Sequence, residues 1–450
     1  MKTFLTKPLA RSSFALCLLT LALGSHTVLA QSALARSAPG ESHTGHTMPT
    51  TPDVPVSDLP TTLDPASTLK GVQKIEIATP KYTPGSDILD DYYCYAINPK
   101  FKRDAMVTGV QVIPGNRRIV HHAILFRIDA GDRAAVLTKD KASGGKGWPC
   151  FGGPGLEERD GASGSAGGNW LSVWVPGAGD GQFPSGLAQA LPKDSLIVMQ
   201  VHYNFSNETG TDNSKVVLSV APQGAKLRAI RSQLAAAPVE IRCADNLKTV
   251  ACLRENTLKE NTARIGFLGG NMLPNGLLMS CGQTAAQYQK PVGNAKNIVN
   301  SCDQTAPGDN TLFAIAGHMH LLAKSIKIEL NPGKPGARTL LSIPKWDYRW
   351  QGNYWFKTPV KIKKGDVMRT TCTFDNSAEN QPMVRGKQQQ PKYVLWSEAT
   401  TEEMCLGILF ADAATATVMP TPPRPGAAMP GMPNPGTPMP GMSVPTPPKP

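Results

Sequence analysis

Histidine is the residue type whose placement in this 450-residue chain says most about its chemistry. Of its eight histidines, three lie among the first 46 residues. The other five form three clusters: His121-His122, His202 and His318-Met319-His320. Imidazole is the commonest protein ligand for metal ions. Five clustered histidines therefore indicate metal binding, although a single histidine on a strand is more often a satisfied core or surface residue.

The spacing within the clusters indicates two metal sites rather than one. Side chains two residues apart on a strand share a face, so His318 and His320 can hold one ion. Adjacent residues such as His121 and His122 normally point to opposite faces. They can share an ion only if the backbone is irregular there or if they bind through different ring nitrogens. His202 can complete the first set, but the third ligand of the second set must be another residue type. Zinc, copper and non-haem iron all accept imidazole, so the metal is left open at this point.

Four segments resemble one known family when they are taken in order along the chain. They are His121-His122-Ala123-Ile124-Leu125-Phe126, Gln200-Val201-His202-Tyr203, Gly317-His318-Met319-His320 and Thr401-Glu402-Glu403-Met404-Cys405. Together they are similar to the copper type II, ascorbate-dependent monooxygenases, which include the peptidylglycine α-hydroxylating and dopamine β-monooxygenases. The resemblance covers most of residues 90–412, and residues 343–347 make it strongest for the bacterial members.

The resemblance implies two copper ions per chain and supplies the ligand that the histidine count leaves open. It implies one copper held by His121, His122 and His202, and another held by His318, His320 and Met404. A neutral, polarizable thioether favours Cu(I) and is a poor zinc ligand. In the family a disulfide joins the cysteine after this methionine to an upstream cysteine, which implies Cys372–Cys405 here.

The resemblance also implies an activity, in which one oxygen atom of O₂ is inserted into a substrate C–H bond. The first copper would relay an electron and the second would bind O₂, with ascorbate or another one-electron reductant as donor. In the family an interdomain cleft separates the coppers, and Gln200, two residues before His202, is a candidate cleft residue. Three positions depart from the peptide-amidating members, which carry arginine, asparagine and tyrosine where this chain has Ala316, Leu406 and Ile408. We therefore expect a neutral or hydrophobic small-molecule substrate rather than peptidylglycine.

Short runs of β-branched and aromatic residues predict the strands that position these clusters. The runs cover Met106–Ile113, Ile119–Ile128, Leu196–Phe205, Val216–Val220, Leu312–Ile315, Ser325–Leu330, Val360–Ile362 and Met404–Phe410. Turn residues such as Pro114-Gly115-Asn116 separate them, and no long stretch keeps a 3.6-residue apolar period. We therefore predict an all-β fold of two antiparallel, jelly-roll-like β-sandwich domains packed side by side, the first at residues 71–225 and the second at residues 226–415.

The two ends of the chain differ from this folded region. Residues 1–30 combine basic residues, an apolar run and small residues before a cleavage position after Ala30, which predicts an export signal. Residues 31–70 predict a flexible linker because they are rich in Ser, Thr and Pro. Residues 416–450 predict a disordered tail, since residues 418–450 hold 13 prolines, with five methionines among them. We expect an exported protein, periplasmic or extracellular.

The cysteines agree with export. Eight remain after the signal and none forms a CxxC pair, which favours up to four disulfides over a thiolate metal site. The order of the cysteines does not fix their pairing, although Cys243 with Cys252 and Cys281 with Cys302 would be the local solution.

Charge and hydropathy limit the choice of partners. The formal net charge is +12, or +9 without the three charges of the signal, and the basic residues are scattered. This pattern argues against nucleic-acid binding. No segment after the signal approaches 18 apolar residues in a row, so we expect no membrane span. Two alternatives to the enzyme are a non-catalytic secreted copper-binding or storage protein and a β-sandwich binding module without metal.

Overall fold

The computed structural model describes residues 69–85, 89–128, 130–156, 170–176, 181–205, 208–348 and 351–414. The expected export signal, the linker up to residue 68 and the tail at 416–450 lie outside these residues. Within the described ranges, no helix is long and apolar enough to cross a membrane.

The first half of the described chain contributes to two sheets. One sheet has five strands in the order β5 (Trp148–Pro149), β2 (Asp90–Ile97), β8 (Leu196–Asn204), β4 (Val120–Ile128) and β6 (Trp170–Trp174). The other begins with β1 (Gln73–Ala78), β9 (Lys215–Val220), β3 (Ala105–Ile113) and β7 (Leu187–Leu191). Large apolar side chains of both sheets form one buried core, so the two sheets make a sandwich.

The second half continues the latter sheet and adds another. The continuation runs through β10 (Arg228–Ala236), β21 (Leu406–Asp412), β13 (Asn310–His318) and β16 (Tyr354–Ile362). The added sheet has the order β12 (Ile298–Thr305), β17 (Val367–Phe374), β14 (Ala323–Leu330) and β15 (Arg338–Ile343). Two short pairs complete the strands: β11 (Glu240–Ile241) with β20 (Val394–Leu395), and β18 (Met383–Val384) with β19 (Lys387–Gln388). A second buried core fills this half.

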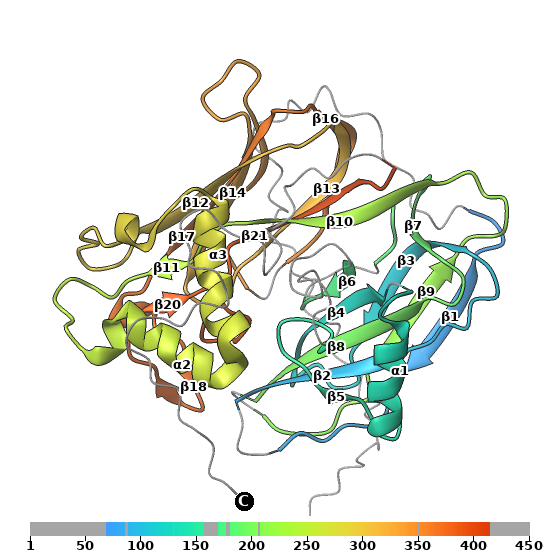
Figure 1. Cartoon of the computed structure of the whole chain (residues 1–450), viewed down its shortest axis with the longest axis horizontal. Coiled ribbons are helices and arrows are strands. Elements are labelled where there is room, and N and C mark those ends of the chain that lie inside the picture. The colour runs from blue at the N-terminus through green and yellow to red at the C-terminus, as the bar shows by residue number, and fades with distance from the viewer. Residues whose placement is uncertain are drawn as a thin grey trace, which may run out of the picture. The chain divides into compact units, whose positions relative to one another are not determined.

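One strand joins the halves. β10 pairs antiparallel with β21 from Ile230 to Ala236, and parallel with β7 through Arg228↔Leu187 and Ala229↔Ala188. Figure 1 shows β10 (green) running from the strands of the second half to those of the first. The all-β fold class is therefore confirmed. The jelly-roll connectivity and the division between residues 225 and 226 stay predictions, although that division falls just before β10.

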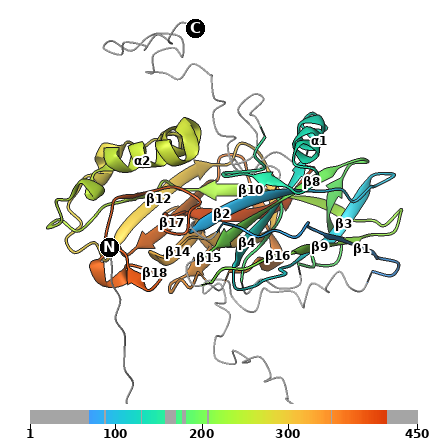
Figure 2. The ribbon, with the colours of Figure 1, turned by 90° about the horizontal axis from the view of Figure 1, so that it is seen from below.

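Each of the eight expected strand segments overlaps a strand, but three helices were not expected. They are α1 (Arg133–Ala142), α2 (Arg254–Phe267) and α3 (Leu273–Ser280). Figure 2 shows α1 and α2 on the same side of the strands. The buried residues of α2 are Arg254, Thr257 and Asn261, so this helix docks through polar contacts. A helix with a polar buried face has no apolar period for a sequence pattern to reveal.

All eight cysteines after the signal are paired. The structure joins Cys94 to Cys150, Cys243 to Cys252, Cys281 to Cys302 and Cys372 to Cys405. The second and third are the local pairs among those that the sequence left open, and the fourth is the pair that the family resemblance implies.

Candidate metal centre

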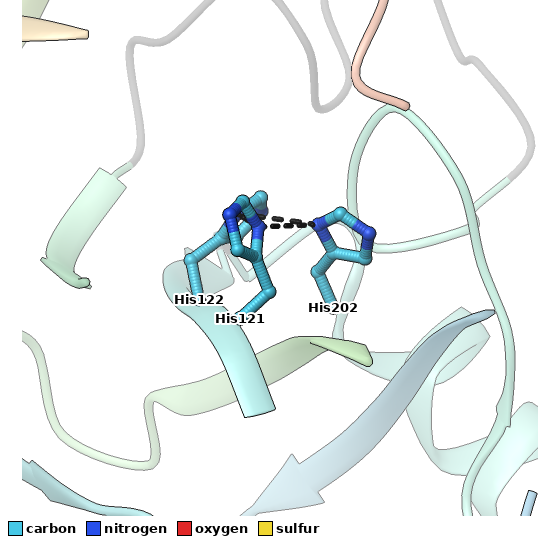
Figure 3. A group of neighbouring side chains, drawn as sticks. All are labelled: His121, His122 and His202. Carbon is cyan, nitrogen blue, oxygen red and sulfur yellow. Dashed lines mark hydrogen bonds between the residues drawn. The ribbon is translucent and has the colours of Figure 1, made fainter. Parts of the chain in front are cut away.

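Three histidines from two neighbouring strands form the first cluster. His121 and His122 lie on β4, and His202 lies on β8 opposite His122. The β4–β8 register shifts between Val120 and His122, which leaves His121 as the extra residue of a β-bulge. The bulge turns His121 toward the same side as His122, and Figure 3 shows both rings directed at His202. Of the two alternatives left open by the sequence, the irregular backbone is therefore the one present.

The ring nitrogens of this cluster fit a bound cation. The three Nδ1 atoms lie 3.1 Å (His121 to His202), 3.3 Å (His121 to His122) and 3.4 Å (His122 to His202) apart. Each Nδ1 either carries a proton and donates, or keeps its lone pair and accepts. Among three nitrogens that are all in mutual contact, at least two must therefore be both donors or both acceptors, and hydrogen bonds cannot satisfy all three contacts. The separations instead suit three nitrogen ligands at about 2.0–2.1 Å from one ion. One ligand atom from each of the three residues lies within 4.8 Å of the other two, so the group could hold a single metal ion.

The partly buried carboxylate of Asp90 orients His202. Its Nε2 lies 2.9 Å from Asp90 Oδ1, so Nε2 carries the proton and Nδ1 keeps its lone pair for an ion. The same oxygen accepts hydrogen bonds from Asn204 Nδ2 (2.8 Å) and Thr400 Oγ1 (2.7 Å). Burial opposes ionisation of Asp90, but the hydrogen bonds from His202, Thr400 and Asn204 outweigh it and lower the carboxyl pKa. A carboxylate behind a ligating histidine sets the tautomer and raises ligand basicity.

The second cluster lies at the end of β13. His318 Nδ1 lies 2.6 Å from Gln351 Oε1, and Gln351 Nε2 donates to the carbonyl of Tyr348. The amide nitrogen of Gln351 is thus assigned, so His318 Nδ1 is the donor to Oε1. His320 Nδ1 donates to the carbonyl of Glu402 at 3.1 Å. Both rings therefore present Nε2 as the free nitrogen, and His320 Nε2 is buried without a hydrogen-bond partner among the described residues.

Backbone hydrogen bonds and a disulfide hold Met404 beside this cluster. The β13–β21 ladder ends at the pair His318↔Leu406, so His320 follows the ladder by two residues and Met404 precedes it by two. The buried Glu403 carboxylate accepts from the backbone N–H of His320 (2.8 Å) and of Met404 (3.2 Å) through Oε2, and from Leu322 N–H (2.6 Å) through Oε1. Cys405, which follows Met404, is held by its disulfide to Cys372. Met404 is thus fixed on both sides next to His320.

Glycine at position 317 follows from close packing. Gly317 pairs with Gly407 across β13 and β21, immediately before the second cluster. A Cβ at Gly317 would lie 3.0 Å from the side chain of Ile326, and one at Gly407 would lie 2.7 Å from that of Ile328. The two glycines let β14 pack tightly behind the strand pair that carries His318.

Burial keeps the imidazoles neutral. Desolvation lowers the pKa of His318 to about 4 and that of His320 to about 3. Desolvation, followed by repulsion from His202, also moves the pKa values of His121 and His122 well below the usual value. These four rings hold lone pairs at neutral pH, which is the state that a metal ion requires. Burial raises the pKa of Glu403 to about 8, although backbone N–H groups oppose the rise.

The two clusters are neighbours. The ring centroids of His122 and His318 lie 6.1 Å apart, and those of His318 and His320 lie 5.2 Å apart. Strands from both halves of the chain thus bring five imidazoles into one buried region.

Gln200 makes contacts of a different kind. It is fully buried and donates from Nε2 to the carbonyl of Gly153 at 2.9 Å, beside the sulfur of Cys150. Its described contacts are thus with the loop after β5 rather than with either histidine cluster, and its place in a cleft stays a proposal.

Several residues that position the clusters gave no signal in the sequence. Asp90 is 112 positions along the sequence from His202, and Gln351 is 33 positions from His318, although each is hydrogen-bonded to that histidine. Strand β2, which carries Asp90, was not among the predicted strands. Glu403 lies inside a segment that the resemblance includes, but only the fold shows that its carboxylate binds the backbone of His320.

Comparison with known proteins addresses the second half of the chain. Residues 278–411 match the family model of the copper type II ascorbate-dependent monooxygenase, C-terminal domain. These residues belong to that family. The matched range contains His318, His320 and Met404 but not the first cluster. No curated protein matches the chain significantly.

Solved structures add little. Bacillus subtilis oxalate decarboxylase is 7% identical over 76% of this chain and 69% of its own, with a TM-score of 0.14. The 11S allergen from Cocos nucifera is 8% identical over 76% of this chain and 89% of its own, also with a TM-score of 0.14. Likeness this low carries no argument about fold or function.

Proposed function

We propose that the protein is a copper-dependent monooxygenase that inserts one oxygen atom of O₂ into a C–H bond of a small-molecule substrate. Ascorbate or another one-electron reductant would supply the electrons. The observation that carries the proposal is the meeting of two largely buried histidine clusters in one region, the second of them inside the matched family domain.

The donor sets support two copper sites of different character. His121, His122 and His202 would hold one ion through three nitrogens, which suits copper in either oxidation state. His318, His320 and Met404 would hold the other through two nitrogens and a thioether, which favours Cu(I). Bound copper would supply one-electron redox chemistry and the activation of O₂.

The chain's own residues position the histidine rings, set their tautomers and exclude water from the two clusters. Asp90, Gln351 and the carbonyl of Glu402 each fix the proton of one histidine on the nitrogen that faces away from the ion. Burial of both clusters keeps bulk water from reactive species, which protects against side reactions.

The surroundings of the second cluster support a neutral or apolar substrate. Leu406 pairs with His318, and Ala316 pairs with Ile408 two residues further along the same strands. All three side chains are buried in the first apolar core. No charge at these positions is available to bind a carboxylate.

Anaerobic copper titration followed by O₂-uptake measurement with ascorbate tests the proposal. We expect two coppers per chain and ascorbate-dependent O₂ consumption that rises with small apolar, aromatic or amine substrates. A capacity well above two would instead support copper storage, and the absence of copper binding would support a binding module.

Two methionine variants separate ligation from packing. Met404→Leu should keep the fold, lose Cu(I) at the second site and lose O₂ uptake, because leucine has similar volume but no thioether. Met319→Leu is the matched control, since Met319 is a fully buried methionine between the two histidines of the same cluster. Equal copper content and turnover in both variants would remove Met404 from the site.

A further inference from the structure

The segment from Glu398 to Glu403, which we name the bridging segment, lies between the two histidine clusters. It connects β20 to Met404, and its ends are joined where Ser397 N–H donates to the carbonyl of Glu403 at 3.0 Å. Its residues are buried or nearly so. The segment is therefore a closed loop whose position depends on the contacts described below.

One end of the bridging segment binds the surroundings of His202. Thr400 Oγ1 donates to Asp90 Oδ1 at 2.7 Å and accepts from Asn204 Nδ2 at 3.1 Å. Asp90 is the carboxylate that holds His202 Nε2. The Thr400 hydroxyl and His202 Nε2 therefore both donate to the same atom, Asp90 Oδ1.

A second anchor lies beside the first. The carbonyl of Glu398 accepts from the Tyr92 hydroxyl at 2.6 Å, and the ring of Tyr92 stacks on that of His202 with centroids 4.2 Å apart. The carboxylate of Glu398 accepts from Gly152 N–H at 3.0 Å. The position of His202 and that of the bridging segment are thus linked through two separate contacts.

The other end of the bridging segment binds the second cluster. The carbonyl of Glu402 accepts the His320 Nδ1 proton at 3.1 Å, and the Glu403 carboxylate accepts the backbone N–H groups of His320 and Met404. Any movement of the segment away from the first half would displace the partner of one ligating histidine and the backbone of the methionine.

We infer that the bridging segment couples the two clusters, so that an ion bound by His121, His122 and His202 raises the affinity of the second site, with Thr400 as the positioning residue. This inference rests on the proposed function. An ion on His202 Nδ1 draws electron density from the ring and strengthens the Nε2–H bond to Asp90. A more ordered Asp90 holds Thr400, and the second site then loses less conformational entropy when it binds. Coupling between sites is reciprocal and typically about 5–150-fold.

A cycle of variants in the full chain measures this coupling. Cu(I) binding at the second site is titrated anaerobically against a competing chelator in the parent, Thr400→Val, His121→Ala and the double variant. We expect each single variant to weaken the second site about tenfold, within the usual range of coupling, and the double variant to weaken it no further. Thr400→Ser keeps the hydroxyl and should retain the parent affinity. Thr401→Val is a matched control, because Thr401 has no described contact with Asp90.

A second readout does not depend on the second metal. In His318→Ala, Cu(I) added to the first site should slow backbone hydrogen exchange at residues 398–404, and the same ion should slow it less when Thr400→Val is present.

The outcomes separate the inference from the function on which it rests. Equal second-site affinity in the parent and His121→Ala would overturn the coupling, whatever Thr400→Val does. Additive losses in the double variant would remove Thr400 as the carrier. Failure of the parent to bind copper at either cluster would instead overturn the proposed function. If Thr400→Val does not fold, the His121→Ala comparison and the effect of Cu(I) on hydrogen exchange in His318→Ala decide the coupling.

Discussion

The carboxylate behind His202 offers the sharpest test of the first cluster. Asp90→Asn keeps Oδ1 as an acceptor for His202, Thr400 and Asn204, so the geometry should survive while the negative charge is lost. A hydrogen bond to a charged group contributes about 1.5–3 kcal/mol, and a neutral one contributes about 0.5–1.5 kcal/mol. The charge itself is thus worth about 1–1.5 kcal/mol at His202.

That difference agrees with the cost known for such partners. Removing the residue that orients a ligating histidine weakens metal binding about 10–100-fold, which equals about 1.4–2.8 kcal/mol. We expect Asp90→Asn to weaken copper at the first site by this factor, measured by competition with a chelator at fixed pH. Asp212→Asn is the control, because the Asp212 carboxylate is likewise a multiple hydrogen-bond acceptor, from Tyr203 and Ser214, but contacts neither cluster.

The same substitution predicts a change with pH. The folded-state pKa of Asp90 lies below its ordinary value of 3.8, so the ionised carboxylate stabilises the fold fully above that pH. The stabilisation is lost as pH falls from about 3.8 toward the folded-state pKa. The difference in unfolding free energy between parent and Asp90→Asn should therefore shrink on acidification, as followed by urea denaturation of the metal-free proteins. An unchanged copper affinity in a folded Asp90→Asn protein would refute the role assigned to Asp90.

Three further expectations concern the second site and the frame around it. His318→Ala should bind one copper in place of two while the first site stays filled, as counted by metal analysis after gel filtration, and retention of both ions would contradict the ligand assignment. Replacing Cys372 and Cys405 together by serine should lower the unfolding free energy by about 2–5 kcal/mol in chemical denaturation and weaken copper binding at the second site. Unchanged copper affinity at that site would show that the disulfide does not hold it. Arg254→Ala leaves the buried Glu240 carboxylate without its ion pair and should lower the unfolding free energy by about 3–5 kcal/mol, with copper content unchanged in the folded fraction. A loss below about 1 kcal/mol would mean that the pair is exposed to solvent.

Residue types and their short-range spacing were enough to predict many of the strands. Runs of β-branched residues with turn residues between them predicted strands at all eight positions, since alternation on a strand is a local property. Strand β2 was missed although its Asp90 and Tyr92 contact His202, because its tyrosine-rich sequence does not alternate clearly. Helix α2 was missed because its buried Arg254 and Thr257 bind a carboxylate and a carbonyl instead of packing in an apolar core.

For the candidate site, the sequence by itself determined which residue types were available and which pairs could share a face. The tertiary structure alone decided the rest. The bulge that turns His121 toward His202 arises from the register of two strands about 80 residues apart. The Thr400–Asp90 hydrogen bond joins residues 310 positions apart, and Gln351 reaches His318 from a loop beyond β15. Such contacts depend on how whole strands align and pack, and a one-residue slip in register would move every side chain of a strand to the other face.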